Sequence, residues 1–370
     1  MSVRTTLLAF SATGLLLGCT PLNLPERADV VLAPVEADWT TLPTQAFRGK
    51  RDDIAFADSE HGWYGTGAGE LFRTVDGGQS WELVARREGT FIRAVAFLDP
   101  MNGFIGNIGT DYYPGVTDTV PLYRTRDGGR TWEPVDTGEA TIAGVCAIDV
   151  LRTDRIFQGQ TVARTVIHAA GRVGGPPGIL RSVDGGDSWS VIDLSDRIGM
   201  ILDVKFFDEN TGLVFAASER SSANAQGVVL MTRDGGQTWS EVYRSGRARE
   251  LIWKADFPTR DIGYATVQSY DPQRAQQLVI KTTDGGATWT ELPMTQNARA
   301  RHFGIGFADV QTGFVGTMDG GYETRDGGLT WSRSNLAPAA NNFAKVAEGD
   351  EVQLFAIGTE VQRRTFRAAP

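Results

Sequence analysis

Apolar and polar residues alternate over short stretches of this chain, and Gly or Asp residues interrupt them. Residues 204–207 and 278–281 are examples of such apolar runs. Runs of this length and composition are typical of β-strands. A helical repeat would need apolar residues at a spacing of about 3.6 over long windows, and no such window occurs. The pattern therefore predicts an all-β fold.

An eight-residue motif recurs six times, about 50 residues apart, among these predicted strands. Each copy reads Ser or Thr, any residue, Asp-Gly-Gly, any residue, Ser or Thr, and Trp. The Asp carboxylate can accept backbone N–H groups of its own turn, and Gly-Gly supplies conformations that a Cβ would penalise. This is an Asp-box, or BNR, turn. Its Asp and Trp residues are Asp76 and Trp81, Asp127 and Trp132, Asp184 and Trp189, Asp234 and Trp239, Asp284 and Trp289, and Asp326 and Trp331.

A second motif recurs upstream of the Asp box. It is an apolar run that ends in Asp and is followed by Gly, for example at residues 95–99 and 305–309. Each unit therefore contains strand A, a turn, strand B, a loop, strand C, the Asp-box turn and strand D. Four strands in a repeat of this length are typical of a propeller blade. The repeat predicts a β-propeller.

Three further strands are expected after the last motif, at residues 343–346, 352–357 and 359–363, and residues 38–42 resemble the strand that follows a box. Pairing this N-terminal strand with the C-terminal ones closes a seventh blade and removes free sheet edges. We predict a seven-bladed propeller over residues 36–365. Six blades with a loose C-terminal tail is the alternative.

The N-terminus has the features of an export signal. Arg4 precedes an apolar run at residues 7–17 that is too short to span a bilayer. The run ends in Leu-Leu-Gly-Cys at Cys19, which resembles a bacterial lipobox. The resemblance implies a signal peptide at 1–18 and a lipid anchor on Cys19. Thr20, rather than Asp, follows the Cys, and by resemblance to Gram-negative lipoproteins this favours an outer-membrane location facing the periplasm or the cell surface. Residues 19–35 are Pro-rich and suit a flexible tether. A plain secretory signal is the alternative.

The bulk composition excludes several functions. A net charge of −9 argues against nucleic-acid binding, which demands a basic surface. Three His residues, His61, His168 and His302, have no metal-ligand spacing, so no metal or other cofactor is expected. Cys146 lies in an apolar run and is interpreted as a small core residue. We expect a monomer.

The topology of a blade predicts where a ligand would bind. A–B turns and Asp-box turns share one face, and D–A and B–C loops share the other. Long B–C insertions at 107–121, 170–177, 218–227 and 269–277 make the second face the candidate binding face. Its predicted partner-binding residues are Arg51, Arg93, Arg197, Arg247, Arg249, Arg301, His302, Tyr112, Tyr113, Trp253 and Tyr270. Arginine suits carboxylate or phosphate ligands, although pairing with Asp52, Asp53, Asp196 or Glu250 inside the fold is the alternative. For His302 a structural role inside the fold is the favoured alternative.

The boxes, the lipobox and the regular spacing together resemble the photosystem II stability/assembly factor family, over about residues 39–363. The resemblance implies a seven-bladed propeller with an arginine patch on one face. It also implies a scaffold that docks a protein or peptide client at a membrane. Nothing in the sequence identifies the client.

The alternative function is a glycoside hydrolase, because sialidases carry the same boxes. A sialidase also has Arg-Ile-Pro near its first blade, whereas the nearest string here is Phe-Ile-Arg-Ala at residues 91–94. Other Asp-box hydrolases place two acidic residues in a cleft between two propellers, whereas the repeats of this chain account for a single propeller. The box aspartates belong to the face opposite the candidate binding face. The sequence therefore predicts a non-catalytic envelope lipoprotein.

Overall fold

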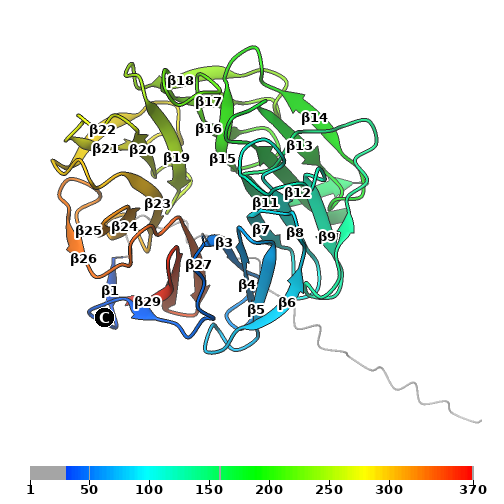
Figure 1. The fold of residues 1–370 in the computed structure, drawn as a ribbon, viewed down its shortest axis with the longest axis horizontal. Coiled ribbons are helices and arrows are strands. Elements are labelled where there is room, and N and C mark those ends of the chain that lie inside the picture. Colours follow the sequence, from blue (N-terminus) through cyan, green and yellow to red (C-terminus); the bar gives the residue numbers. More distant parts are fainter. Residues whose placement is uncertain (1–30, 50, 158–159, 369–370) are drawn as a thin grey trace, which may run out of the picture.

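The structure is a computed structural model that describes residues 31–49, 51–157 and 160–368. Within these ranges the chain forms strands and no helix, and the strands build seven sheets around a central opening (Figure 1). This arrangement confirms the all-β prediction and matches a seven-bladed propeller. The described part of the chain has no helix that is long and apolar enough to cross a membrane.

Six of the sheets have four antiparallel strands, each taken from consecutive sequence. The first contains β3 (Arg51–Phe56), β4 (Gly62–Thr66), β5 (Glu70–Thr74) and β6 (Glu82–Arg86). The second contains β7 (Ile92–Phe97), β8 (Gly103–Asn107), β9 (Leu122–Thr125) and β10 (Glu133–Pro134). The third contains β11 (Ala147–Phe157), β12 (Gln160–Gly171), β13 (Gly178–Ser182) and β14 (Ser190–Asp193).

The next three sheets follow the same plan. The fourth contains β15 (Met200–Phe206), β16 (Gly212–Ala217), β17 (Gly227–Thr232) and β18 (Ser240–Arg244). The fifth contains β19 (Glu250–Asp256), β20 (Gly263–Ser269), β21 (Gln277–Thr282) and β22 (Thr290–Thr295). The sixth contains β23 (His302–Phe307), β24 (Gly313–Thr317), β25 (Gly320–Thr324) and β26 (Ser332–Ser334).

The seventh sheet joins the two ends of the described chain. It contains β27 (Asn342–Glu348), β28 (Glu351–Ile357) and β29 (Val361–Ala368), and β29 pairs with β1 (Leu32–Pro34) and β2 (Thr40–Thr41). The propeller therefore starts at Leu32 and not at residue 36, and it ends at Ala368 and not at residue 365. The reason is the length of β29, which offers backbone partners to Leu32–Pro34. The predicted signal peptide, Cys19 and most of the tether lie outside the described residues.

All six box turns have the same side-chain hydrogen bonds. In the first copy, Thr74 Oγ1 donates to Asp76 Oδ1 at 2.7 Å, and Asp76 accepts the N–H and the hydroxyl of Ser80. The second glycine of each box has a positive φ and lies against the preceding sheet. A Cβ on Gly286, where φ is +92°, would lie 2.5 Å from the Leu213 side chain of β16. The boxes therefore both close their own hairpins and pack one sheet on the next.

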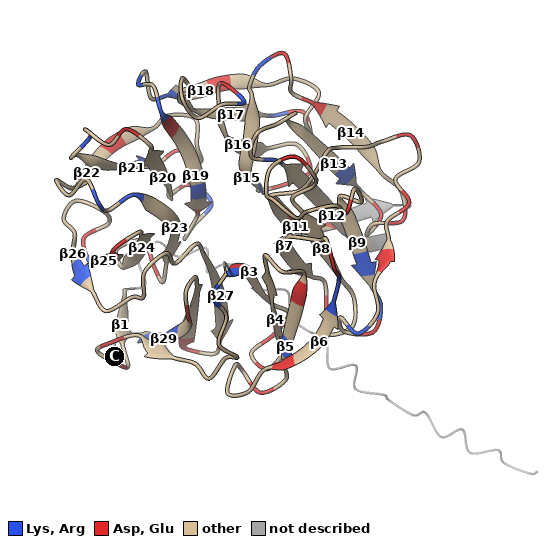
Figure 2. Cartoon of the chain, in the orientation of Figure 1, with Lys and Arg blue, Asp and Glu red and all other residues tan. Residues whose placement is uncertain are grey.

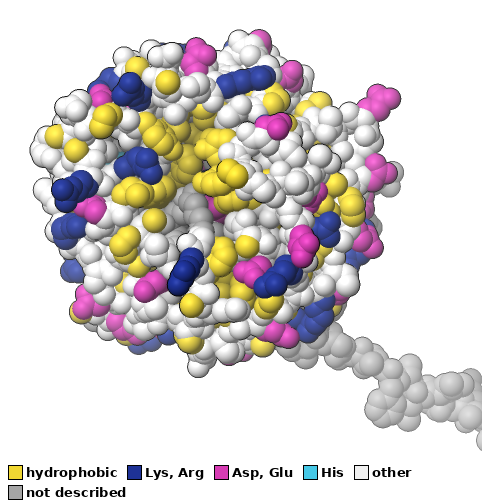
Figure 3. Space-filling view, in the orientation of Figure 1, with side chains coloured by type: hydrophobic (Ala, Val, Ile, Leu, Met, Phe, Trp, Pro, Cys, Tyr) yellow, Lys and Arg dark blue, Asp and Glu magenta, His cyan; other side chains and the backbone are white. Residues whose placement is uncertain are grey.

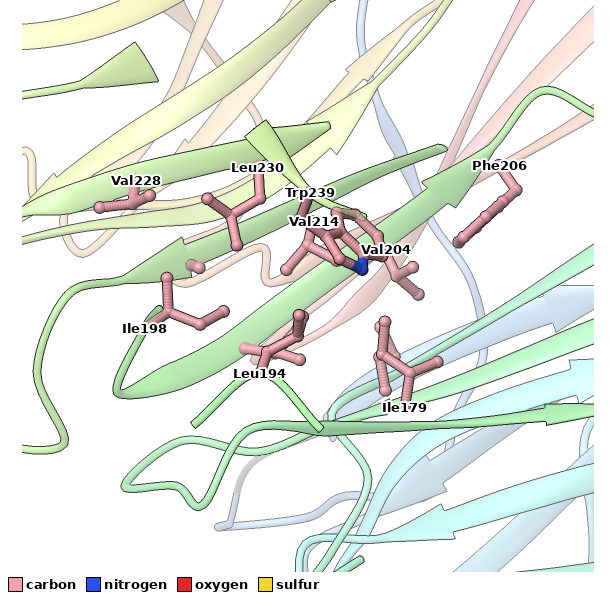
Figure 4. Packing of buried hydrophobic residues seen from close by; sticks show 13 residues of the cluster. Ile179, Leu194, Ile198, Val204, Phe206, Val214, Val228, Leu230 and Trp239 are labelled. Atoms are coloured by element: carbon pink, nitrogen blue, oxygen red, sulfur yellow. The ribbon is translucent and has the colours of Figure 1, made fainter. Parts of the chain in front are cut away.

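Rings and carboxylates also join neighbouring sheets. Trp63 of β4 stacks on Phe97 of β7 with ring centroids 3.4 Å apart, and His168 stacks on Phe206 at 3.6 Å. On the inner strands, Asp53 Oδ2 accepts the backbone N–H of Val95 from the next sheet at 2.7 Å. Apolar side chains fill the remaining space, as the cluster between the third and fourth sheets illustrates (Figure 4). Each sheet is therefore held mainly by its two neighbours.

Backbone hydrogen bonds define the two faces of the ring. The box glycine Gly235 donates to Asn210 O of an A–B turn at 2.9 Å, so boxes and A–B turns share the box face. Tyr270 of a B–C loop donates its backbone N–H to Arg249 O of a D–A loop at 2.8 Å. We call the face with these D–A and B–C loops the loop face. The four long B–C loops that the sequence predicts are present on it.

Candidate binding face

Two of the predicted arginines lie inside the fold. Arg51 and Arg93 are each 2% exposed. Arg51 donates to the backbone oxygens of Gln45 and Thr359. Arg93 Nη1 lies 3.7 Å from Asp52 Oδ1, and its guanidinium lies 5.4 Å from the ring of Trp253. The expectation that these two side chains contact a partner directly is wrong, because the fold itself surrounds them.

Arg247 is paired with acidic side chains of the fold, which was the alternative to partner binding. Its Nε donates to Glu250 at 2.9 Å and its Nη2 donates to Glu291 Oε1 at 2.6 Å. These hydrogen bonds to carboxylates are strong, and they occupy the planar fork of the guanidinium. Arg197 is half exposed, donates to Trp239 O and lies 4.0 Å from Asp196. Neither residue adds a free cation to a continuous patch, and basic and acidic residues are interspersed around the ring (Figure 2).

Two further candidates are buried. His302 is fully buried, and burial lowers its pKa to about 3, so its ring is neutral and cannot reach a partner. Trp253 is 4% exposed and packs in a cluster with Phe91 and Phe303. These two expectations of direct contact are also wrong. Trp253 forms part of the wall beneath the face and does not belong to its surface.

The remaining candidates gather where the central opening meets the loop face. Tyr112 and Tyr113 are 38% and 39% exposed, and their rings lie 5.2 Å apart. The guanidinium of Arg301 lies 4.8 Å above the ring of Tyr270 and contacts the sulfur of Met318. Tyr113 is close enough to interact electrostatically with both Arg301 and Tyr270. We call Tyr112, Tyr113, Tyr270, Arg301 and Met318 the mouth cluster.

The electrostatics of the mouth cluster favour hydrogen-bond donors. Burial raises the pKa of all three tyrosines, so their hydroxyls stay protonated at neutral pH. Arg301 adds a partly exposed cation. Arg249, exposed and with φ of +66°, lies on the D–A loop beside Tyr270. Hydrophobic side chains gather around the central opening in Figure 3. The cluster therefore combines exposed rings, donors and positive charge.

A groove lies beside the mouth cluster and shares Tyr113 with it. Its volume is about 390 Å³. We call it the loop groove. Its lining residues are Phe47, Gly49, Gly67, Ala68, Gly89, Thr90, Phe91, Tyr113, Pro114, Gly115 and Val116. None of these side chains is charged, and the walls come from four separate loops.

Sequence reasoning did not find the loop groove, Met318 or the ion pairs of the inner strands. Lys205 Nζ lies 2.9 Å from Asp149, and Lys254 Nζ lies 3.3 Å from Asp203. The signal that the sequence offers for the groove is the glycine-rich segment at residues 65–69, which by itself is better interpreted as a strand-to-turn crossing. The partners that complete these features come from distant loops and strands.

Two other kinds of site, a metal site and a reactive carboxylate in an Asp-box turn, find little support among the described residues. No three His, Cys, Asp or Glu side chains among residues 31–49, 51–157 and 160–368 gather in a way that could hold a metal ion. The box carboxylates are engaged by their own turns. Hydrogen bonds from Ser80 and Thr74 lower the pKa of Asp76 to about 2, which makes it a weak proton acceptor.

No protein-family model matches the chain, and no curated protein matches it. Several solved structures share its fold. "YCF48 bound to D1 peptide" superposes with a TM-score of 0.60 at 18% identity, covering 92% of this chain and 98% of that chain. YCF48 from Cyanidioschyzon merolae has a TM-score of 0.60 at 17% identity, covering 88% and 98%. The WD40 β-propeller domain of Doa1 has a TM-score of 0.58 at 11% identity, covering 91% and 97%. These similarities define the fold as a β-propeller.

Proposed function

We propose that this chain is a non-catalytic binding protein of the cell envelope, anchored by a lipid on Cys19. In this proposal it is an assembly-factor-like propeller of the Asp-box type that holds a protein or peptide client on its loop face. The observation that carries the proposal is the mouth cluster, where Tyr112, Tyr113 and Met318 are exposed beside a cation. Exposed aromatic side chains next to arginine are typical of interface hot spots.

Two further points support a client of this kind. One of the structures that share the fold is YCF48 bound to a D1 peptide, so a propeller of this shape can hold a peptide. The charge at the mouth comes from Arg249 and Arg301, a smaller set than the six arginines expected from the sequence. A ligand with an apolar surface and a few carboxylates suits this combination better than a highly acidic one.

Site-specific photo-crosslinking in intact envelopes tests the proposal. A photoreactive phenylalanine at position 113 should capture a client, whereas the same residue at position 329 should not. Leu329 is the matched control because it is 67% exposed in an Asp-box turn on the other face. Tyr113→Ala should then weaken the purified interaction by about 30-fold, the effect of one hot-spot residue.

Two results would contradict the proposal. Equal capture from positions 113 and 329 would mean that the loop face has no special role. Turnover of sialosides or oligosaccharides by the purified chain would contradict the non-catalytic part and would favour the glycoside hydrolase.

A further inference from the structure

The loop groove has the shape of a pocket for an apolar side chain. The rings of Phe47, Phe91 and Tyr113 and the side chain of Val116 form its walls. Its volume of about 390 Å³ falls within the range of pockets that bind small ligands or side chains. The lining has no ionised group that would have to lose its hydration when an apolar group enters. Its chemistry therefore matches a side chain such as leucine or phenylalanine.

Glycines keep this pocket open. A Cβ on Gly67 would lie 2.8 Å from the ring of Phe91, so a larger residue would push this wall aside. Gly89 has φ of +74°, and a Cβ there would lie 2.2 Å from Thr117 Oγ1. Residues without side chains also leave backbone exposed, to which an extended segment can approach closely. The groove suits a chain segment better than a rigid, convex surface.

The position of the groove indicates where the rest of a bound segment would lie. Tyr113 borders the groove and its ring lies 5.2 Å from that of Tyr112, so the groove and the mouth cluster are adjacent and meet at Tyr113. Arg48 is exposed between the lining residues Phe47 and Gly49, and Glu88 is exposed beside Gly89 on another lining loop. Charge complementarity at the Arg48 side favours an acidic residue next to the anchoring side chain.

We propose that the loop groove is the anchor pocket of the client site. It takes one apolar side chain of an extended peptide segment, with an acidic neighbour paired to Arg48, and the segment continues across Tyr113 to the mouth cluster. This inference rests on the proposed function and adds to it the chemical class of the ligand. The groove supplies specificity, and the mouth cluster supplies contact area.

Ala68→Trp is the decisive variant. Ala68 lines the groove but is exposed in the turn between β4 and β5, so a larger side chain there can fill the groove without entering the core. Leu329→Trp adds the same indole to the box face and is the matched control. Thermal unfolding of both variants checks that each one folds.

The probes are random twelve-residue peptides displayed on phage, selected on the full chain in detergent and then synthesised with a fluorescent label. Selected peptides should share one apolar residue with Asp or Glu within two positions of it. Ala68→Trp should weaken their binding by about 30-fold or more, as expected for a lost hot spot, and Leu329→Trp should leave it unchanged. Arg48→Glu should weaken binding by several-fold, and peptides with Lys in place of the acid should recover it.

The outcomes separate this inference from the proposed function. Peptides that bind Ala68→Trp as tightly as the wild type, yet lose affinity with Tyr112→Ala, would overturn the anchor pocket and leave the loop face as a binding surface. If no peptide is selected on the wild type, both the pocket and the peptide-binding function are overturned.

Discussion

Replacing Trp63 with alanine is expected to lower the free energy of unfolding by about 3–5 kcal/mol, the usual cost of removing a fully buried aromatic side chain. Trp63 has no exposed surface and stacks on Phe97 of the next sheet with an interplanar angle of 4°. Its Nε1 donates to Gly128 O, in the box turn of that sheet, at 2.9 Å. The substitution therefore removes a stack and a hydrogen bond between two sheets at once.

Denaturant unfolding followed by circular dichroism measures this loss. Trp132→Ala is the control, because Trp132 is half-buried and its Nε1 donates within its own turn to Gly129 O at 2.8 Å. Trp132→Ala should cost clearly less than Trp63→Ala. Equal losses would mean that burial and the contact between sheets do not decide the stability of this ring.

Lowering the pH from 7 to 5 is expected to destabilise the propeller by about 4 kcal/mol through two histidines, because each contributes a loss that approaches about 1.4 kcal/mol per pH unit below pH 6.5. His168 and His302 are fully buried, and burial lowers the pKa of each to about 3. The unfolded chain protonates these rings below about pH 6.5, while the folded chain does not. Stability is therefore fully present above pH 6.5 and falls as the pH drops towards 3.

The double variant His168→Phe with His302→Leu tests this acid sensitivity. Phenylalanine retains the stack on Phe206, and neither new side chain titrates. The difference in unfolding free energy between pH 7 and pH 5 should shrink by most of the expected amount. The box aspartates lose their contribution to stability only at lower pH, because their pKa values fall below 3.8 in the folded state. Burial raises the pKa of Asp53, so this group favours the folded state as the pH falls. It does so equally in the wild type and in the double variant, and it does not affect their difference. An unchanged acid response in the double variant would contradict the assignment.

The repeat was readable from sequence because its interactions are local. Thr74, Asp76 and Ser80 bond to one another within one turn, so a short motif is enough to predict them. The number of sheets followed from the spacing of the motif and from the three apolar runs after Trp331. These inferences needed no knowledge of distant contacts.

The surface was less predictable, and β-bulges at the start of the inner strands are the reason. The register shifts between Ile92 and Ala94 in β7, and again between Ile252 and Ala255 in β19. A bulge reverses the expected alternation of inward and outward side chains. Arg93 and Trp253 lie within these shifts and are buried, although their positions in the sequence suggest the mouth.

Distant partners explain the other differences. Arg247 bonds Glu291, which lies on β22 of the following sheet, and no motif links the two residues. The loop groove likewise combines loops that are separated in sequence, and its glycines resemble ordinary turn residues. Side chains whose environment comes from several loops cannot be assigned by pattern alone.

The pairing of β1 and β2 with β29 has a consequence for the order in which the molecule can be completed. During synthesis residues 32–41 leave the ribosome before the other strands of the propeller, and their partner strand β29 leaves after them. Until then six sheets can assemble as an open crescent with two unprotected ends, each able to pair with another nascent chain. The strands β27–β29 therefore convert an aggregation-prone intermediate into a closed ring, and deletions within them should lower the yield of folded protein far more than their small share of the mass suggests.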